Sequence, residues 1–224
     1  MASQSLTKLQ KYAYDYLKDM ILSGKLIDNE IYSETKISKE IGISRTPMRD
    51  ALRHLSQEGF IDILPSKGFI LHRLTEKDIM EILQIRCAIE GYATYLLTKQ
   101  NKTEHGIKTI NKLRNILKKQ EDIISTSRDL VEFTEYDTLF HTTIVSFPEN
   151  SGFDEMFDNY MYRIKKLAMD SLSHDGRLEE TMKEHFNIFN CICEGNIEDI
   201  YNITLYHMES PKQLNLKDYY KNDL

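Results

Sequence analysis

The sequence lacks the features that mark membrane-bound and secreted proteins. No apolar run approaches the roughly 18 residues that a membrane-spanning helix needs. Residues 1–11 lack the apolar segment and small-residue cleavage site of a signal peptide. The three cysteines, an odd number, do not suit a framework of paired disulfides. These absences favour a cytoplasmic protein with no membrane partner.

Proline is also scarce, at positions 47, 65, 148 and 211 alone. Because proline breaks helix interiors, long helices are possible over most of the chain after residue 75. The sequence shows no internal repeat, low-complexity segment, P-loop, nucleophile elbow or HExxH motif. It therefore lacks the short motifs of common nucleotide-binding and hydrolytic enzymes.

The charge is unevenly distributed along the chain. A net charge of −6 over the whole chain does not favour binding to nucleic acid, which is itself negatively charged. Residues 1–73, however, contain 11 basic and 9 acidic side chains, whereas residues 74–224 contain 18 and 26. The first part is thus slightly basic and the second is acidic, which indicates two domains with different partners.

Three helices are expected at the start of the chain. Residues 6–23 carry apolar side chains at helical spacing. Ser33 is a suitable N-cap for a second, short helix that ends at Gly42. Ser44 is expected to cap a third helix, which ends at Gly59.

Two short apolar runs follow the third helix. Residues 60–64 and 69–71 flank a turn of the sequence Pro-Ser-Lys-Gly, which predicts a β-hairpin. Three helices and then a hairpin is the order of a winged helix-turn-helix. We therefore expect a DNA-binding domain over residues 1–73, with double-stranded operator DNA as its partner.

The start of the third helix carries the side chains that such a domain uses. Arg45 and Arg49 are four residues apart and share one helix face. A guanidinium can donate two hydrogen bonds to guanine or grip a phosphate, and hydroxyl groups suit phosphate contacts. The turn of the predicted hairpin, which is the tip of the wing, adds the cationic side chain of Lys67 and a backbone without a side chain at Gly68. The predicted DNA contacts are Ser44, Arg45, Thr46, Arg49, Lys67 and Gly68.

These residues also carry a resemblance to a known family. The segments 43–52, 58–60 and 67–69 resemble the motif of GntR-family regulators. In that family the arginines that match Arg45 and Arg49, and the wing glycine that matches Gly68, contact DNA. The resemblance covers residues 6–73.

The second part of the chain reads as entirely helical. A capping box at residues 75–78 begins this part, and from there to residue 208 the apolar residues recur at helical spacing. This pattern predicts about six helices and no strand. Residues 211–224 are interpreted as a tail or a short terminal helix. The expected fold is therefore mainly α, with an all-helical bundle over residues 74–224. Such a half resembles the FadR-type, or FCD, subgroup of GntR regulators.

Four residues of this half are candidate metal ligands. Asp137 and His141 lie four apart on one helix face, whereas His185 and His207 occur on later helices. From spacing alone the signal is weak, because a histidine on an apolar face is more often a buried core residue. The FCD resemblance implies that all four bind one divalent transition metal per chain: Zn²⁺, Ni²⁺ or Mn²⁺.

Arg86 is the candidate effector-binding residue. It stands four residues before Glu90, with which it can form an ordinary helix ion pair. The resemblance implies instead that its guanidinium faces the effector pocket. A guanidinium beside a metal suits a small carboxylate or a sugar acid, since both bind anionic oxygen.

The sequence therefore predicts a regulator, not an enzyme. We expect a homodimer that binds a palindromic operator, usually as a repressor, and whose DNA affinity responds to a small molecule. One alternative is a metal-free sensor of another organic ligand. The other is a metal-dependent hydrolase tethered to DNA, which would need a general base and an open coordination position beside the metal.

Overall fold

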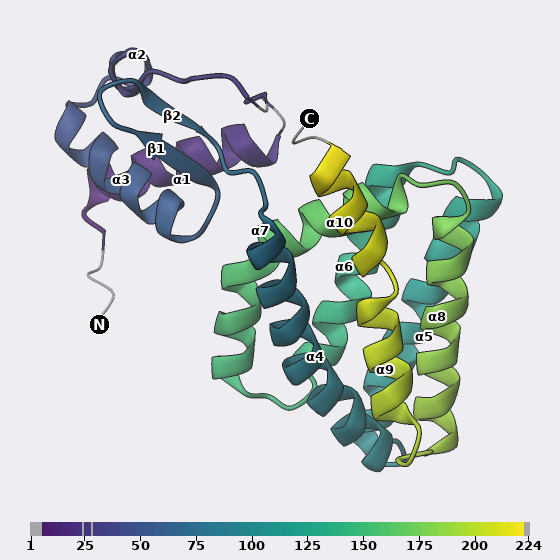
Figure 1. The fold of residues 1–224 in the computed structure, drawn as a ribbon. Coiled ribbons are helices and arrows are strands. Elements are labelled where there is room, and N and C mark those ends of the chain that lie inside the picture. Colours follow the sequence, from purple (N-terminus) through teal and green to yellow (C-terminus); the bar gives the residue numbers. More distant parts are fainter. Residues whose placement is uncertain (1–5, 24, 28, 222–224) are drawn as a thin grey trace. The chain divides into compact units, whose positions relative to one another are not determined.

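The computed structural model describes residues 6–23, 25–27 and 29–221. The chain divides into two compact units, residues 1–73 and residues 74–224 (Figure 1). Helices dominate both units, which confirms the predicted mainly α fold. In the described ranges, no helix is both long and apolar enough to cross a membrane.

The first unit combines three helices with a two-stranded antiparallel sheet (Figure 1). Its elements are α1 (Lys8–Leu22), α2 (Glu34–Glu40), α3 (Arg45–Gln57), β1 (Ile61–Leu64) and β2 (Gly68–Leu71). Helix α1 packs on α3, and the core side chains Ala13, Leu17, Met48 and Leu55 have no exposed surface. This is the predicted winged helix-turn-helix.

The two short helices begin differently. The Ser33 hydroxyl accepts a hydrogen bond from the Lys36 backbone N–H at 3.3 Å, so Ser33 caps α2 as predicted. Ser44 occupies the N-cap position of α3, but its hydroxyl makes no capping bond. The predicted N-cap position of Ser44 is therefore confirmed, whereas the capping hydrogen bond expected from its hydroxyl is not formed. Its exposed hydroxyl is not engaged in capping.

The wing is held in place by a backbone bridge to the segment before α2. The Tyr32 N–H donates to the Phe69 carbonyl at 2.8 Å, and the Phe69 N–H donates to the Tyr32 carbonyl at 3.0 Å. Gly68 has φ 129°, and a Cβ atom there would lie 2.0 Å from the Tyr32 carbonyl oxygen. Only glycine fits this position, for a reason internal to the fold.

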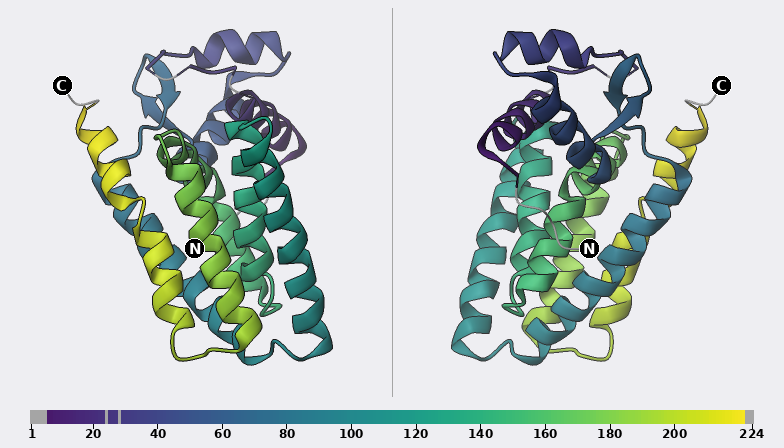
Figure 2. Two further views of the ribbon diagram at one scale, coloured as in Figure 1. Left: turned by 90° about the vertical axis from the view of Figure 1, so that its right-hand side faces the viewer. Right: turned by 90° about the vertical axis from the view of Figure 1, so that its left-hand side faces the viewer.

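The second unit is a bundle of seven helices within the described residues. They are α4 (Glu76–Lys99), α5 (Glu104–Ser125), α6 (Leu130–Val145), α7 (Ser151–Leu172), α8 (Arg177–Glu194), α9 (Ile200–Glu209) and α10 (Lys212–Lys221). Helix α4 runs beside α9, and α5 packs against both α6 and α8 (Figure 2). This packing brings side chains from α4, α6, α8 and α9 together inside the bundle.

Helix α10 is the addition to the predicted set of about six helices. Its Leu216 and Tyr219 pack against an apolar cluster that includes Ile82 and Leu83 of α4. Its Asn215 side chain is buried. The segment interpreted as a tail or a short terminal helix therefore forms a helix over Lys212–Lys221. Residues 222–224 lie outside the described part.

Candidate functional site

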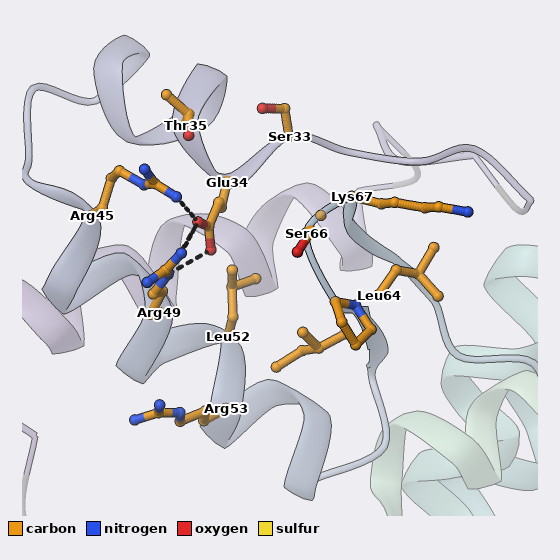
Figure 3. Close-up of a pocket in the computed structure, with 13 residues that line it drawn as sticks. Ser33, Glu34, Thr35, Arg45, Arg49, Leu52, Arg53, Leu64, Ser66 and Lys67 are labelled. Carbon is orange, nitrogen blue, oxygen red and sulfur yellow. Dashed lines mark hydrogen bonds and ion pairs between the residues drawn. The ribbon is translucent and has the colours of Figure 1, made fainter.

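Four of the six predicted DNA contacts line one groove of the first unit: Arg45, Arg49, Lys67 and Gly68 (Figure 3). The side chains of Ser44, Thr46 and Lys67 are exposed, and those of Arg45 and Arg49 are 56% and 55% exposed. The groove lies between the starts of α2 and α3 and the wing turn. Arg45, Arg49 and Lys67 are thus accessible around this groove, whereas Ser44 and Thr46 are exposed but do not line it.

Glu34, at the start of α2, holds both recognition arginines (Figure 3). Its Oε1 accepts from Arg45 Nη2 at 2.6 Å and from Arg49 Nη2 at 2.8 Å. The Arg49 Nε lies 3.0 Å from Oε1 and 3.1 Å from Oε2. Hydrogen bonds from Arg49 and then Arg45 lower the pKa of Glu34. This contact was not predicted from the sequence.

The second unit brings the four predicted metal ligands together. His141 on α6, His185 on α8 and His207 on α9 each offer one nitrogen, and these nitrogens lie within 4.8 Å of one another. Asp137 Oδ1 lies 3.5 Å from His185 Nε2 and 3.9 Å from His141 Nε2. All four side chains are buried. We call this group the histidine cluster.

Two of the three imidazoles are each oriented by a carboxylate of their own. His141 Nδ1 lies 2.5 Å from Glu90 Oε2, and His207 Nδ1 lies 2.6 Å from Glu184 Oε2. Burial raises the pKa of Glu90, but Arg86 and His141 outweigh it and lower the pKa to about 2. Burial likewise raises the pKa of Glu184, and bonds from His207 and Arg177 lower it to about 2.

Both carboxylates are therefore ionised at neutral pH and can only accept hydrogen bonds. Each Nδ1 must carry the proton, which turns the lone pair of Nε2 toward the middle of the cluster. For His185 the partner is an amide: its Nδ1 lies 3.0 Å from Gln120 Oε1. Fixing a ligating imidazole through its second nitrogen is the usual arrangement around protein-bound metals.

The Nε2 atoms themselves show that a cation fits this cluster. The Nε2 atoms of His141 and His207 are 3.2 Å apart, so with both Nδ1 atoms protonated their lone pairs face each other unless a proton or a cation is shared between them. His185 Nε2 is buried and makes no hydrogen bond to any described residue. Two nitrogens about 2.1 Å from one tetrahedral metal lie about 3.4 Å apart. A metal held by Asp137 and the three Nε2 atoms would satisfy every one of these groups.

Three partners of the cluster were not predicted from the sequence. Glu90 was considered only as an ion-pair partner, and Gln120 not at all. Glu184 had no predicted role, yet its carboxylate orients His207. The only signals for them were the position of Glu90 four residues after Arg86 and that of Glu184 beside His185.

Arg86 forms the helix ion pair considered for it and also lines a cavity. Its Nε donates to Glu90 Oε1 at 2.7 Å, as an ordinary helix pair would. It also lines a cavity of about 30 Å³ beside the histidine cluster. Four buried polar atoms on the side chains that line this cavity have no hydrogen-bond partner among the described residues: Arg86 Nη2, Arg177 Nε, Thr181 Oγ1 and Asn215 Oδ1.

Comparison with known families identifies the architecture. The family described as bacterial regulatory proteins, gntR family, matches residues 9–71, and the FCD domain matches residues 81–210. The chain belongs to the GntR family. Its helical unit is an FCD domain, so the resemblance found in the sequence is confirmed. Helix α10 of this GntR protein lies beyond the residues that match the FCD domain. Asn215 therefore lines the cavity from outside the matched part of the chain.

Several relatives are regulators by name. The uncharacterized HTH-type transcriptional regulator YdhC of Bacillus subtilis is 28% identical and covers 87% of this chain and 85% of its own. The gluconate operon transcriptional repressor of that species is 30% identical and covers 80% and 70%. A GntR structure from Rhodococcus sp. RHA1 has a TM-score of 0.72 at 17% identity, covering 95% and 100%, and shows a shared fold. These names describe regulators, which confirms the prediction that this GntR protein is not an enzyme.

The stability of the metal-free GntR protein is expected to depend on pH below about 6.5. Burial, then His207 and His141, lower the pKa of His185 well below its usual value, and burial lowers that of His207. Unfolded histidines take up protons below about pH 6.5 while these two resist, so acid favours the unfolded state. Each resisting site removes about 1.4 kcal/mol of unfolding free energy per pH unit.

Urea unfolding in EDTA between pH 7.5 and 5.5 measures this dependence. The midpoint should fall steeply in the wild type and less steeply in His185→Gln. Equal slopes in the two proteins would contradict the assignment of the effect to the buried histidines.

Proposed function

We propose that this GntR protein is a homodimeric repressor that binds a palindromic operator and responds to a small anionic molecule. The family match and the exposed arginines of α3 support operator binding. Helix-turn-helix dimers place two recognition helices one DNA turn apart, which requires a two-fold symmetric site. The name of the gluconate operon repressor supports repression as the direction of control.

The observation that carries the effector proposal is the cavity beside the histidine cluster. Arg86 and Arg177 line the same cavity as Asp137, His141 and His207, and each has a guanidinium nitrogen, Arg86 Nη2 and Arg177 Nε, without a hydrogen-bond partner among the described residues. A bound Zn²⁺, Ni²⁺ or Mn²⁺ would supply a Lewis-acidic position for an anionic oxygen. The guanidinium groups would bind a second anionic oxygen, and Thr181 and Asn215 suit hydroxyl groups.

This combination fits a small carboxylate or a sugar acid. The relative named for the gluconate operon supports that class, since gluconate is a sugar acid. The cavity of about 30 Å³ has room for roughly one water molecule. An organic acid therefore requires the cavity to open, and α10, which contributes Asn215 to the wall, is the element beyond the matched FCD range.

The regulatory response follows from this requirement. A ligand shifts DNA affinity only if it binds two conformations of the protein unequally. The narrow cavity of about 30 Å³ is one conformation, and the widened, ligand-bound cavity is another. We propose that opening the bundle changes the spacing of the two winged units in the dimer, so that one of the two conformations matches the operator.

Fluorescence anisotropy with an operator recovered by in vitro selection tests this function. Operator affinity should fall steeply with salt, because each phosphate contact lowers the slope of log K against log salt by about 0.9. One member of a panel of sugar acids and small carboxylates should shift that affinity about fivefold or more in metal-loaded protein. A salt-independent affinity, or no response to any acid, would contradict the proposal.

A further inference from the structure

One carboxylate neutralises half the charge of the recognition arginines. Glu34 bonds to both guanidinium groups, and its own side chain is only 19% exposed. The group of Glu34, Arg45 and Arg49 therefore presents one net positive charge, where the two arginines alone would present two. Because Ser33 caps α2 through its hydroxyl, Glu34 is held at the first position of a fixed helix.

The other acidic residues near this surface bond elsewhere. Asp50 accepts from Gln10 Nε2 at 2.8 Å and from Arg53 Nη1 at 3.3 Å, and Glu40 accepts from the Tyr16 hydroxyl at 3.0 Å. The pairing of Glu34 with the arginines is thus specific to its position at the start of α2.

A carboxylate at this place affects two kinds of DNA contact unequally. Phosphates attract any cation regardless of sequence, and a nearby negative charge opposes that attraction. A guanine edge carries no net charge and binds a guanidinium through O6 and N7 in a planar geometry. Glu34 therefore opposes phosphate binding more than it opposes base reading. It also restrains both guanidinium groups before DNA arrives.

We infer that Glu34 is a specificity-determining residue, which suppresses binding to non-operator DNA by holding Arg45 and Arg49 in a half-neutralised, oriented pair. This inference rests on the proposed contact of these arginines with DNA. Glu34 acts through the arginines and is a positioning residue. Its removal should therefore increase binding to random DNA and erode discrimination, whereas loss of an ordinary DNA contact would weaken both.

The test compares Glu34→Gln with Glu40→Gln, which removes the same charge from the same helix without touching the arginines. Each dimer is titrated against the selected operator and a scrambled duplex of equal length. Glu34→Gln should bind the scrambled duplex about tenfold more tightly and the operator less than threefold more tightly. Its salt slope on scrambled DNA should steepen by about 0.9 for each added phosphate contact. Glu40→Gln should change both affinities equally and by less than threefold.

Glu34→Asp keeps the charge and should bind scrambled DNA within twofold of the wild type. If Glu34→Gln behaves like Glu40→Gln, or if Glu34→Asp behaves like Glu34→Gln, the inference is overturned while the proposed function stands. If the wild type does not discriminate between the two duplexes, or Arg49→Ala binds as the wild type does, the proposed function itself fails.

Discussion

Arg49→Ala should abolish specific operator binding without disturbing the fold. The guanidinium is exposed at the start of α3 and bonds only to Glu34 among the described residues, so its removal leaves the core intact. A bidentate contact between arginine and guanine is worth about 1–3 kcal/mol, and a dimer makes it twice. The loss should therefore be roughly 30-fold to more than 10,000-fold in operator affinity.

Arg128→Ala is the matched control. Arg128 forms an exposed ion pair with Glu179 at 2.7 Å, much as Arg49 does with Glu34, but it belongs to the helical unit. Anisotropy titrations should show wild-type operator affinity for Arg128→Ala, and the thermal midpoints of both variants should stay close to that of the wild type. Normal footprinting of the operator by Arg49→Ala would defeat the assignment of α3 as the recognition helix.

His141→Ala should eliminate metal binding. His141 is central to the cluster, with its Nε2 3.2 Å from that of His207 and its Nδ1 bonded to Glu90. Elemental mass spectrometry of untagged protein should find about one metal per chain in the wild type and almost none in the variant. Saturating metal at 100 times its dissociation constant should stabilise the wild type by about 2.7 kcal/mol and leave the variant unchanged.

His105→Ala provides the control for this loss. His105 stacks on Phe147 and bonds to a backbone carbonyl, outside the histidine cluster. It should retain the full metal content. Absence of metal from the wild type, even after incubation with Zn²⁺, Ni²⁺ and Mn²⁺, would remove the metal site. The protein would then be a metal-free sensor whose histidines form a buried polar core.

The DNA-binding unit could be predicted well because its signals are local. A serine at a helix start, a glycine at a helix end and a proline–glycine turn each act within a few residues of the chain. The recognition helix follows from these signals. The contact of Glu34 with Arg49 does not, because it joins residues 15 positions apart through the packing of α2 on α3.

The metal site was predictable only in its ligands. Asp137 and His141 share a helix face by spacing, but the meeting of α6, α8 and α9 is a tertiary fact that only the family resemblance supplied. Glu90 and Gln120 lie 51 and 65 residues from their histidines, and no local pattern marks such pairs. Helix α10 was uncertain because its few apolar side chains give a weak helical period.

Sequencing the genomic fragments that the purified wild-type protein retains would test the central claim most directly. Arg49→Ala, run in parallel, reports the background of non-specific binding. We predict that the wild type enriches fragments sharing one short palindrome, with half-sites about one helical turn apart, and that the variant enriches none. Fragments without a common motif, or the same motif from both proteins, would contradict operator recognition by the start of α3.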